Sequence, residues 1–363
     1  MDDNRLDYSN YLHVEEILSH QHLISERHGN AAHIEMLYII VHQVYELWFK
    51  EIIHELDSVR AMFREDYVNE ESIGEAVRRL HRIEKVQQLL IQQVDVLETM
   101  SPLEFLDFRK YLGTASGFQS FQFRLLENKL GLRPEERLQY ANKGYAEEFD
   151  EKKTALIKQT EQEPSLFELV GRWLERTPFV SFKEFHFRDQ FLKAVSQMLR
   201  AEKELVEKDT ARSDQERQMM LGRISETEES FKAFLDEKEH DKMVERGLRR
   251  LSSQATLAAL FIQLYRDEPI LRLPSELLDT LVQIDENFTN WRARHAVMVH
   301  RMLGRKMGTG HSSGYDYLKR TIEKHRIFSD FFNLATYLIP RSELPPLPPE
   351  VKKQLGFYHT AAS

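Results

Sequence analysis

The sequence predicts an all-α protein, a multi-helix bundle with a charged helical insertion. Apolar residues recur at three- and four-residue steps along most of the 363-residue chain, which is the period of an amphipathic helix. Strand-like alternation is nearly absent, and turn-forming pairs such as Gly29-Asn30 and Thr177-Pro178 separate the helical runs. No repeat of about 34 residues is visible, which weakens a helical-solenoid interpretation.

Composition excludes several classes of function. The chain has no cysteine, so disulfides, thiolate catalysis, Cys-ligated zinc and iron–sulfur clusters are ruled out. A net charge of -9 argues against a broad electrostatic grip on nucleic acid or anionic lipid. No apolar stretch approaches the roughly 20 residues of a membrane span. The acidic first ten residues resemble neither a secretory signal nor a transit peptide, so we expect a cytoplasmic protein.

The local content of charged residues and proline divides the chain into segments. Residues 147–250 are dense in Glu, Lys, Asp and Arg at helical spacing, which predicts a solvated helical hairpin or small subdomain inserted in the fold. The flanking ranges 31–146 and 251–339 are expected to form the main helical core. Residues 340–363 are rich in proline, which favours an extended tail on the surface.

His295 is the clearest candidate for a metal-ligating residue. A single long helix is predicted from Ser275, as N-cap, to Met302, with Gly304 at its C-terminal stop. His295 lies within the apolar stripe of this helix, four residues after Trp291. Burial keeps an imidazole neutral and leaves a lone pair free, so the residue suits a haem iron ligand. The alternative is a core histidine that is hydrogen-bonded within the protein.

A second candidate lies on the helix predicted to start near Ala31. Tyr38, His42 and Phe49 share one face of it, being four and seven residues apart. A single imidazole among aromatic side chains suits a distal hydrogen-bonding group or a haem ligand. A core histidine bonded to a carbonyl is the alternative here too.

Arg109 is a candidate for binding a carboxylate. It follows Phe105 by four residues on a helix whose start is marked by the capping box of Ser101 and Glu104, with Pro102 at the first helical position. An arginine beside an aromatic ring can hold a carboxylate through two parallel hydrogen bonds. A solvated arginine is the alternative. Ser116 can start the next helix, and a helix N-terminus suits an anionic group; a plain N-cap is the alternative.

Three other patterns are set aside. The loop Gly308 to Gly314 lacks the Gly-Lys-Ser/Thr ending of a phosphate-binding loop and follows a helix. His54-Glu55 lacks the second histidine of a zinc-protease motif. His33-Ile34-Glu35 has the spacing of a non-haem iron site, but no third ligand is identifiable.

Several short motifs are distributed along the chain. They are Tyr8-Ser9-Asn10-Tyr11-Leu12, Met36 to Gln43 with Glu46 to Lys50, Asp107-Phe108-Arg109, Ala115 to Ser120, Trp291 to His295, Gly308-Thr309-Gly310 and Ser312-Ser313-Gly314. Together they resemble the tryptophan 2,3-dioxygenase family along most of the chain. The resemblance implies that the helical core is a haem-dioxygenase bundle.

The same resemblance implies roles for individual residues. His295 is expected to be the axial ligand of the haem iron, and His42 the catalytic distal histidine that faces the indole N–H. Haem-binding residues are expected to be Trp291, Ser116, Gly117, Arg124 (near a propionate) and Tyr317. Substrate-binding residues are expected to be Tyr38 and Phe105 as walls of the indole pocket, Arg109 and Thr309 as anchors of the zwitterion, and Tyr8, Tyr11 and Leu12. The last three belong to a segment, residues 1–30, that reaches the site of a neighbouring subunit.

The reaction implied by the resemblance is the first step of tryptophan catabolism by the kynurenine pathway. Haem b (iron protoporphyrin IX) and the co-substrate O2 would cleave the indole C2–C3 bond of L-tryptophan to give N-formyl-L-kynurenine. A cytoplasmic homotetramer is implied. Two alternatives stay open: a related haem oxygenase that acts on a substituted tryptophan or inserts one oxygen atom, and a helical scaffold without catalysis.

Two positions depart from the family's usual pattern. Position 38 is Tyr where Phe is usual, and a phenol in an apolar site needs a hydrogen-bond partner. Its hydroxyl would bond to His42, shift preference towards a substituted tryptophan, or have no effect. His311 stands in place of the usual glycine of the substrate loop and is expected to narrow it.

Overall fold

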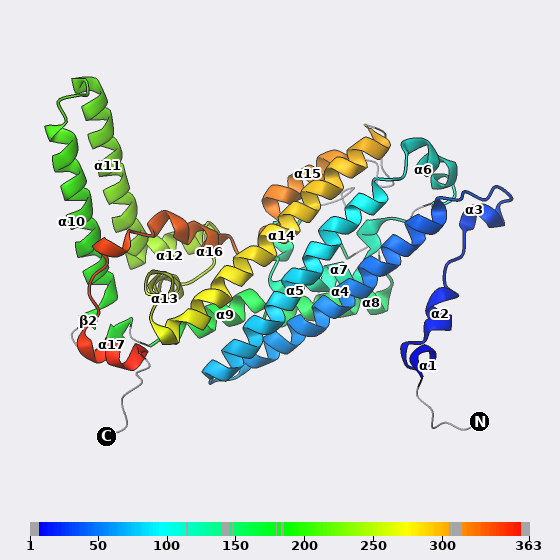
Figure 1. The fold of residues 1–363 in the computed structure, drawn as a ribbon, viewed down its shortest axis with the longest axis horizontal. Helices are drawn as coiled ribbons and strands as arrows, with labels where there is room; N and C mark the ends of the chain where they lie inside the picture. Colours follow the sequence, from blue (N-terminus) through cyan, green and yellow to red (C-terminus); the bar gives the residue numbers. More distant parts are fainter. Residues whose placement is uncertain are drawn as a thin grey trace. The chain divides into compact units, whose positions relative to one another are not determined.

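A computed structural model of the chain describes residues 7–113, 115–138, 145–146, 149–178, 180–182, 185–304, 306 and 314–356. Helices make up almost all the regular structure of these residues, which confirms the all-α prediction (Figure 1). The strands in the described part of the chain are β1 (Ser181–Phe182) and β2 (Phe185–His186), which form one short antiparallel pair.

The chain forms two compact units. Unit 1 consists of Met1–Glu55, Arg82–Glu163 and Glu286–Arg326, and unit 2 of Leu56–His81, Pro164–Asp285 and Ile327–Ser363. Three long helices contribute residues to both: α4 (Glu35–Arg64), α5 (Glu70–Leu97) and α14 (Arg272–Leu303). The division into ranges 31–146, 147–250 and 251–339 stays a prediction from sequence texture.

In unit 1, side-chain to backbone hydrogen bonds link α4 and α5. The Tyr45 hydroxyl of α4 donates to the Leu90 carbonyl of α5 at 2.8 Å, and Gln93 Nε2 of α5 donates to the Val41 carbonyl of α4 at 2.9 Å. The remaining elements of this unit are α1 (Tyr8–Leu12), α2 (Val14–Leu18), α3 (Ile24–Arg27), α6 (Pro102–Arg109), η1 (Gly117–Gln119), α7 (Phe121–Leu130), η2 (Pro134–Glu136), α8 (Glu151–Gln162) and α15 (Gly314–Lys324).

The start of α4 is fixed by its first residue. The Glu35 carboxylate accepts hydrogen bonds from the backbone N–H groups of Ile24 at 2.9 Å and Ser25 at 3.0 Å. This capping of α3 ties the N-terminal segment to α4. The helix begins at Glu35, whereas the sequence predicted a start near Ala31.

Predicted helix ends were correct in part. Ser101 and Glu104 form the expected capping box at the start of α6, with Pro102 at the first helical position. Ser116 caps η1, a single turn that precedes α7. The prediction of Ser275 as the N-cap of α14 is wrong, because α14 begins at Arg272 and Pro274 fits within its first turn. Gly304 ends the helix as predicted, with φ of 57°.

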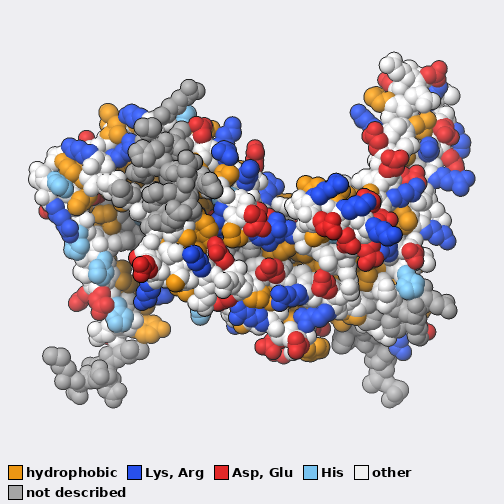
Figure 2. Space-filling view, turned by 180° about the vertical axis from the view of Figure 1, so that it is seen from behind, with side chains coloured by type: hydrophobic (Ala, Val, Ile, Leu, Met, Phe, Trp, Pro, Cys, Tyr) orange, Lys and Arg blue, Asp and Glu red, His pale blue; other side chains and the backbone are white. Residues whose placement is uncertain are grey.

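Unit 2 contains the paired helices α10 (Phe187–Lys208) and α11 (Asp214–Leu235). Lys and Arg side chains alternate with Asp and Glu over this hairpin (Figure 2), and many of its residues are exposed. The root of the hairpin is anchored by Phe187, whose ring lies 5.1 Å from that of Phe261. The other elements of the unit are α9 (Leu166–Glu175), α12 (Glu237–Glu245), α13 (Ser253–Leu264), η3 (Pro269–Leu271), α16 (Ser329–Asn333), η4 (Leu334–Tyr337), η5 (Arg341–Glu343) and α17 (Pro349–Leu355).

The proline-rich tail differs from the prediction. An extended surface segment was expected, yet α17 forms with Pro349 at its start and buries Val351 and Leu355 completely. Proline at the first helical position costs no hydrogen bond, and two apolar side chains four residues apart supply a buried face. Within the described residues, no helix is both long and apolar enough to cross a membrane.

Candidate haem and substrate site

The described residues of the predicted site all belong to unit 1. They lie on α1, α4, α6, α7, α14 and α15 and in the segment around η1. A single compact unit thus carries the candidate site, apart from the residues that the structure does not describe.

His295 is a neutral imidazole beside a tryptophan. Its ring stacks on that of Trp291, one helical turn earlier on α14, with centroids 5.6 Å apart and planes inclined by 8°. Burial, together with the nearby His42 side chain, lowers the pKa of His295 to about 4. The half-buried imidazole makes no hydrogen bond to any described residue, so its lone pair is available as a ligand.

An aromatic cage surrounds Trp291. The centroid of its ring lies 5.3 Å from that of Phe123 on α7, and 6.1 Å and 6.4 Å from those of Tyr45 and Phe49 on α4. Burial raises the pKa of Tyr45 to about 12, so this side chain stays a neutral phenol. Edge-to-face contacts of this kind fix ring orientation, and here they hold the helix turn that carries His295.

His42 is oriented by its own helix. Its Nδ1 lies 2.7 Å from the Tyr38 carbonyl oxygen, an acceptor, so Nδ1 carries the proton and Nε2 has the free lone pair. Burial lowers the pKa of His42 more than the Tyr38 carbonyl and the Glu46 carboxylate raise it. The ring is therefore neutral at neutral pH. The Tyr45 ring lies between the two histidine sites, because its centroid is 6.5 Å from that of His42 and 6.1 Å from that of Trp291, on which His295 stacks.

Aromatic rings from α4 and α6 lie beside His42. The Tyr38 ring centroid is 4.1 Å from that of His42, 6.0 Å from Phe105 and 5.3 Å from Phe108. Burial raises the pKa of the Tyr38 phenol, and its hydroxyl has no hydrogen-bond partner among the described residues. Arg109 is the last residue of α6 and is half-buried, one turn after Phe105.

A second group of predicted residues meets around η1. Phe118 follows Ser116 and Gly117, and its ring packs edge-on against Tyr317 of α15 at 5.0 Å. Arg124 of α7 donates through Nη2 to the Phe118 carbonyl oxygen at 3.4 Å. The structure thus brings Arg124, Tyr317 and the Ser116–Gly117 segment together.

Other predicted residues stand apart or are not described. Thr309 and His311 lie outside the described residues. Tyr8, Tyr11 and Leu12 lie on α1 with 76%, 66% and 40% of their surfaces exposed, so within one chain they do not cover the site.

Several residues of the site were not predicted from the sequence. Tyr45 and Phe108 line it at helical spacing from His42 and Phe105, a signal that was available. Glu127, Arg137 and His325 join Arg124 in a buried charged cluster, for which the sequence gives no signal because charged residues in helices are usually solvated.

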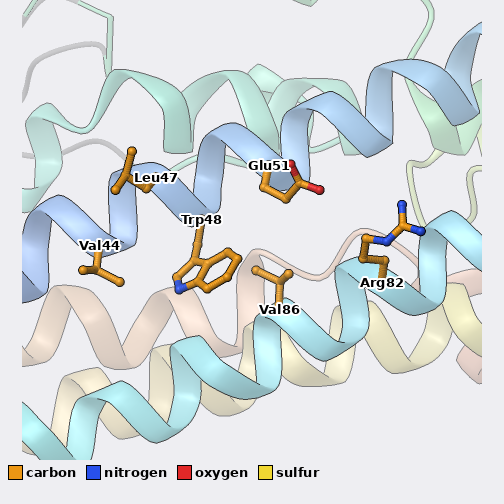
Figure 3. A pocket seen from close by; sticks show the side chains of 6 residues that line it. All are labelled: Val44, Leu47, Trp48, Glu51, Arg82 and Val86. Carbon is orange, nitrogen blue, oxygen red and sulfur yellow. The ribbon is translucent and has the colours of Figure 1, made fainter. Parts of the chain in front are cut away.

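An open hollow of about 450 Å³ lies elsewhere in unit 1 (Figure 3). It is lined by the α4 residues Val44, Leu47, Trp48 and Glu51 and the α5 residues Arg82 and Val86. None of the predicted site residues lines it, and Leu47 is 54% exposed. The hollow is a surface feature of the α4–α5 pair, separate from the candidate site.

The donor set fits an iron that brings its own equatorial ligands. Within the described residues, no three His, Asp or Glu side chains gather to hold a metal ion between them. A porphyrin supplies four nitrogen ligands, so a single neutral imidazole such as His295 completes the protein's share of a haem site. The residues present therefore fit haem.

The chain is similar to known proteins along most of its length. The sequence profile of the family described as Tryptophan 2,3-dioxygenase matches residues 1–338. Proteins named Tryptophan 2,3-dioxygenase from Alteromonas mediterranea and Bdellovibrio bacteriovorus are each 46% identical, over 351 and 352 residues, covering 97% of this chain and 97% and 98% of their own lengths. A protein of the same name from Dictyostelium discoideum is 44% identical over 96% of this chain and 88% of its own.

Proposed function

The chain belongs to the tryptophan 2,3-dioxygenase family, and we propose that it opens the indole ring of L-tryptophan with O2. Both oxygen atoms enter across the C2–C3 bond, and the product is N-formyl-L-kynurenine, the first intermediate of the kynurenine pathway. The observation that carries the proposal is a pair of neutral imidazoles connected by aromatic rings. His295 makes no hydrogen bond to a described residue and stacks on Trp291, and the Tyr45 ring contacts both Trp291 and His42.

We infer that His295 holds the iron of haem b, with Trp291 packed beside the porphyrin. Haem, when bound, supplies the activation of O2. The protein keeps the His295 lone pair free, because protonation would place a charge in an aromatic, buried environment. Ser116, Gly117, Tyr317 and Arg124 are proposed to contact the edge of the porphyrin.

His42 is proposed to accept a hydrogen bond from the substrate's indole N–H. Because Nδ1–H donates to the Tyr38 carbonyl, Nε2 of the neutral ring carries no proton. Nε2 can therefore accept a hydrogen bond from the indole N–H. The same bond fixes the ring orientation. His42 thus orients the indole ring and accepts its hydrogen bond at a defined atom.

The substrate is proposed to lie between aromatic walls and polar anchors. Tyr38 and Phe105 lie 6.0 Å apart, centroid to centroid, and form one wall of the slot for the indole ring. Arg109 at the end of α6 binds the substrate carboxylate, and Thr309 contacts the ammonium and carboxylate groups. Holding the ring and the zwitterion together restricts the substrate to the orientation in which C2 and C3 face the reactive oxygen.

We propose that the active form is a homotetramer in which α1 of one chain covers the site of a neighbour. The exposed Tyr8, Tyr11 and Leu12 support this, because aromatic and apolar side chains with 40–76% exposure favour a covering partner. The cytoplasmic location stays a prediction from the sequence.

The test is a turnover assay with isotopically labelled O2. The protein is purified with haem supplied, reduced, and given L-tryptophan, and the product is identified by mass spectrometry. Two labelled oxygen atoms in N-formyl-L-kynurenine are expected. One labelled atom, or turnover only with a ring-substituted tryptophan, supports a different haem oxygenase. The absence of a Soret band after reconstitution would favour a scaffold without catalysis.

A further inference from the structure

A buried carboxylate in unit 1 holds three arginines at once. Glu127 of α7 is 1% exposed. Its Oε1 accepts from Nη2 of Arg292 on α14 at 2.9 Å, and its Oε2 accepts from Nη1 of Arg124 at 3.1 Å and Nη1 of Arg137 at 2.5 Å. All three arginines are buried, at 5%, 8% and 9% exposure respectively. We call these four residues the Glu127 cluster.

Among the described residues, the cluster carries more positive than negative charge. Arginine stays protonated in proteins, so one carboxylate faces three cations. Within the described residues, the ion pairs of these arginines all end on Glu127. His325 adds no charge, because burial lowers its pKa and its Nε2 accepts from the Leu138 N–H at 3.4 Å.

The other partners of the arginines are neutral. Arg137 donates to Asn128 Oδ1 at 2.6 Å, Arg124 to the Phe118 carbonyl at 3.4 Å, and Arg292 to the His325 carbonyl at 3.2 Å. The Nε atoms of Arg124 and Arg137 are buried without a partner among the described residues. Buried charge in excess is costly unless an anion compensates for it, so on the count of the described residues the cluster lacks two negative charges.

The cluster adjoins the candidate haem site on two sides. Through the Phe118 carbonyl, Arg124 reaches the segment of Ser116 and Gly117. Arg292 lies three residues before His295 on α14, and its guanidinium lies 5.9 Å from the ring centroid of Phe123, which contacts Trp291. The cluster therefore adjoins residues that are proposed to contact the porphyrin.

We propose that the Glu127 cluster is the electrostatic counterpart of the two propionates of the porphyrin. Arg124 faces the ligand edge. Arg137 and Arg292 supply the charge that exceeds the single carboxylate, and Glu127 is a positioning residue that fixes the three guanidinium groups. The proposal rests on the proposed function, because it takes haem as the ligand, and it extends the contact expected of Arg124 to a network from three segments of the chain.

The test compares two porphyrins that differ at the propionates, which are charged carboxylates in one and neutral methyl esters in the other. The full-length protein, freed of haem, is titrated with haem and with haem dimethyl ester, in which both propionates are uncharged, and the Soret band reports the dissociation constant of each. Wild-type protein is expected to bind haem about tenfold or more tightly than the ester, and added salt should narrow the gap.

The variants Arg137→Gln and Arg292→Gln locate the source of this preference. Each is expected to weaken haem binding about tenfold while leaving ester binding within about twofold of the wild type. The matched control is Arg294→Gln, which removes a half-buried arginine from the same helix, paired with Asp95 and Glu98, and should change neither constant.

The outcomes separate this inference from the proposed function. Equal affinity of the wild type for both porphyrins, or equal losses for both in the variants, overturns the role of the cluster while haem binding stands. A wild type that binds neither porphyrin overturns the proposed function and this inference with it. If a variant does not fold, as judged by circular dichroism, the wild-type comparison of haem and ester with its salt dependence still decides the question.

Discussion

Replacing Arg109 with leucine tests how the substrate is anchored. Arg109 ends α6, one turn after Phe105, whose ring lies 6.0 Å from Tyr38 beside the imidazole of His42. A guanidinium here can hold a carboxylate through two charge-assisted hydrogen bonds. Leucine keeps apolar contact with neighbouring side chains and removes every donor.

The expected loss follows from the setting of the side chain. A hydrogen bond to a charged group contributes about 1.5–3 kcal/mol of binding free energy when it is buried. Arg109 is half-buried, so solvent reduces the contribution of its two hydrogen bonds together to about 2–3 kcal/mol. This free energy corresponds to a fall in kcat/KM of about 30- to 160-fold. Because the carboxylate is far from the reacting bond, the anchor acts alike before and during the chemistry, so most of the loss should appear in KM.

The assay uses L-tryptophan and tryptamine, which lacks the carboxylate. Arg109→Leu should lose kcat/KM for tryptophan only, with haem content unchanged by the Soret band. Lys110→Leu is the matched control, since Lys110 is the exposed cation next in the chain, 4.8 Å from the Tyr111 ring centroid. An unchanged KM for tryptophan would remove Arg109 from the site, and equal losses for both amines would mean that its role is structural.

Three further predictions concern other parts of the molecule. His295→Gly should be purified without haem, and added imidazole should restore the Soret band; full pigment without imidazole would contradict the ligand assignment. Tyr38→Phe should change the free energy of unfolding by less than about 1 kcal/mol, because its hydroxyl has no partner among the described residues, and a larger loss in urea unfolding would refute this. Buried His240 donates to the Leu251 carbonyl at 2.8 Å, and burial lowers its pKa. Below the usual value of about 6.5, the unfolded chain binds a proton that the folded chain does not, so stability should fall as pH drops from about 7 to 5.5. The free energy of unfolding of His240→Gln should depend less on pH than that of the wild type. The same pH dependence in both proteins would contradict this role of His240.

Much of the fold could be predicted because it depends on local physics. The spacing of apolar residues fixes which face of a helix is buried, and Val41, Tyr45 and Phe49 are buried on α4 at four-residue steps. The capping box of Ser101 and Glu104 is also local, and it forms as predicted. His42 and His295 could be singled out for the same reason, since each lies in an apolar stripe.

Some helix starts were less predictable because they involve contacts with other segments. The carboxylate of Glu35, the first residue of α4, accepts the N–H groups of Ile24 and Ser25, about ten residues earlier in the chain, and so caps α3. The α17 helix forms in a proline-rich segment because Val351 and Leu355 find a buried surface. Neither cause is visible in the residues of the helix alone, because both depend on what the rest of the chain brings to it.

The buried charged residues show most clearly what could not be predicted from the sequence. Arg292 and Arg294 stand two residues apart in the Trp-Arg-Ala-Arg-His segment, and nothing in the sequence distinguishes them. Two residues on a helix differ by about 200° around its axis, so the side chains point to opposite sides. Arg292 is 5% exposed and meets Glu127, whereas Arg294 pairs with Asp95 and Glu98 near solvent. The difference depends on α7, which places a carboxylate against one side of α14 only. A ligand that needs positive charge near His295 therefore depends on a residue 165 positions away from Arg292 in the chain.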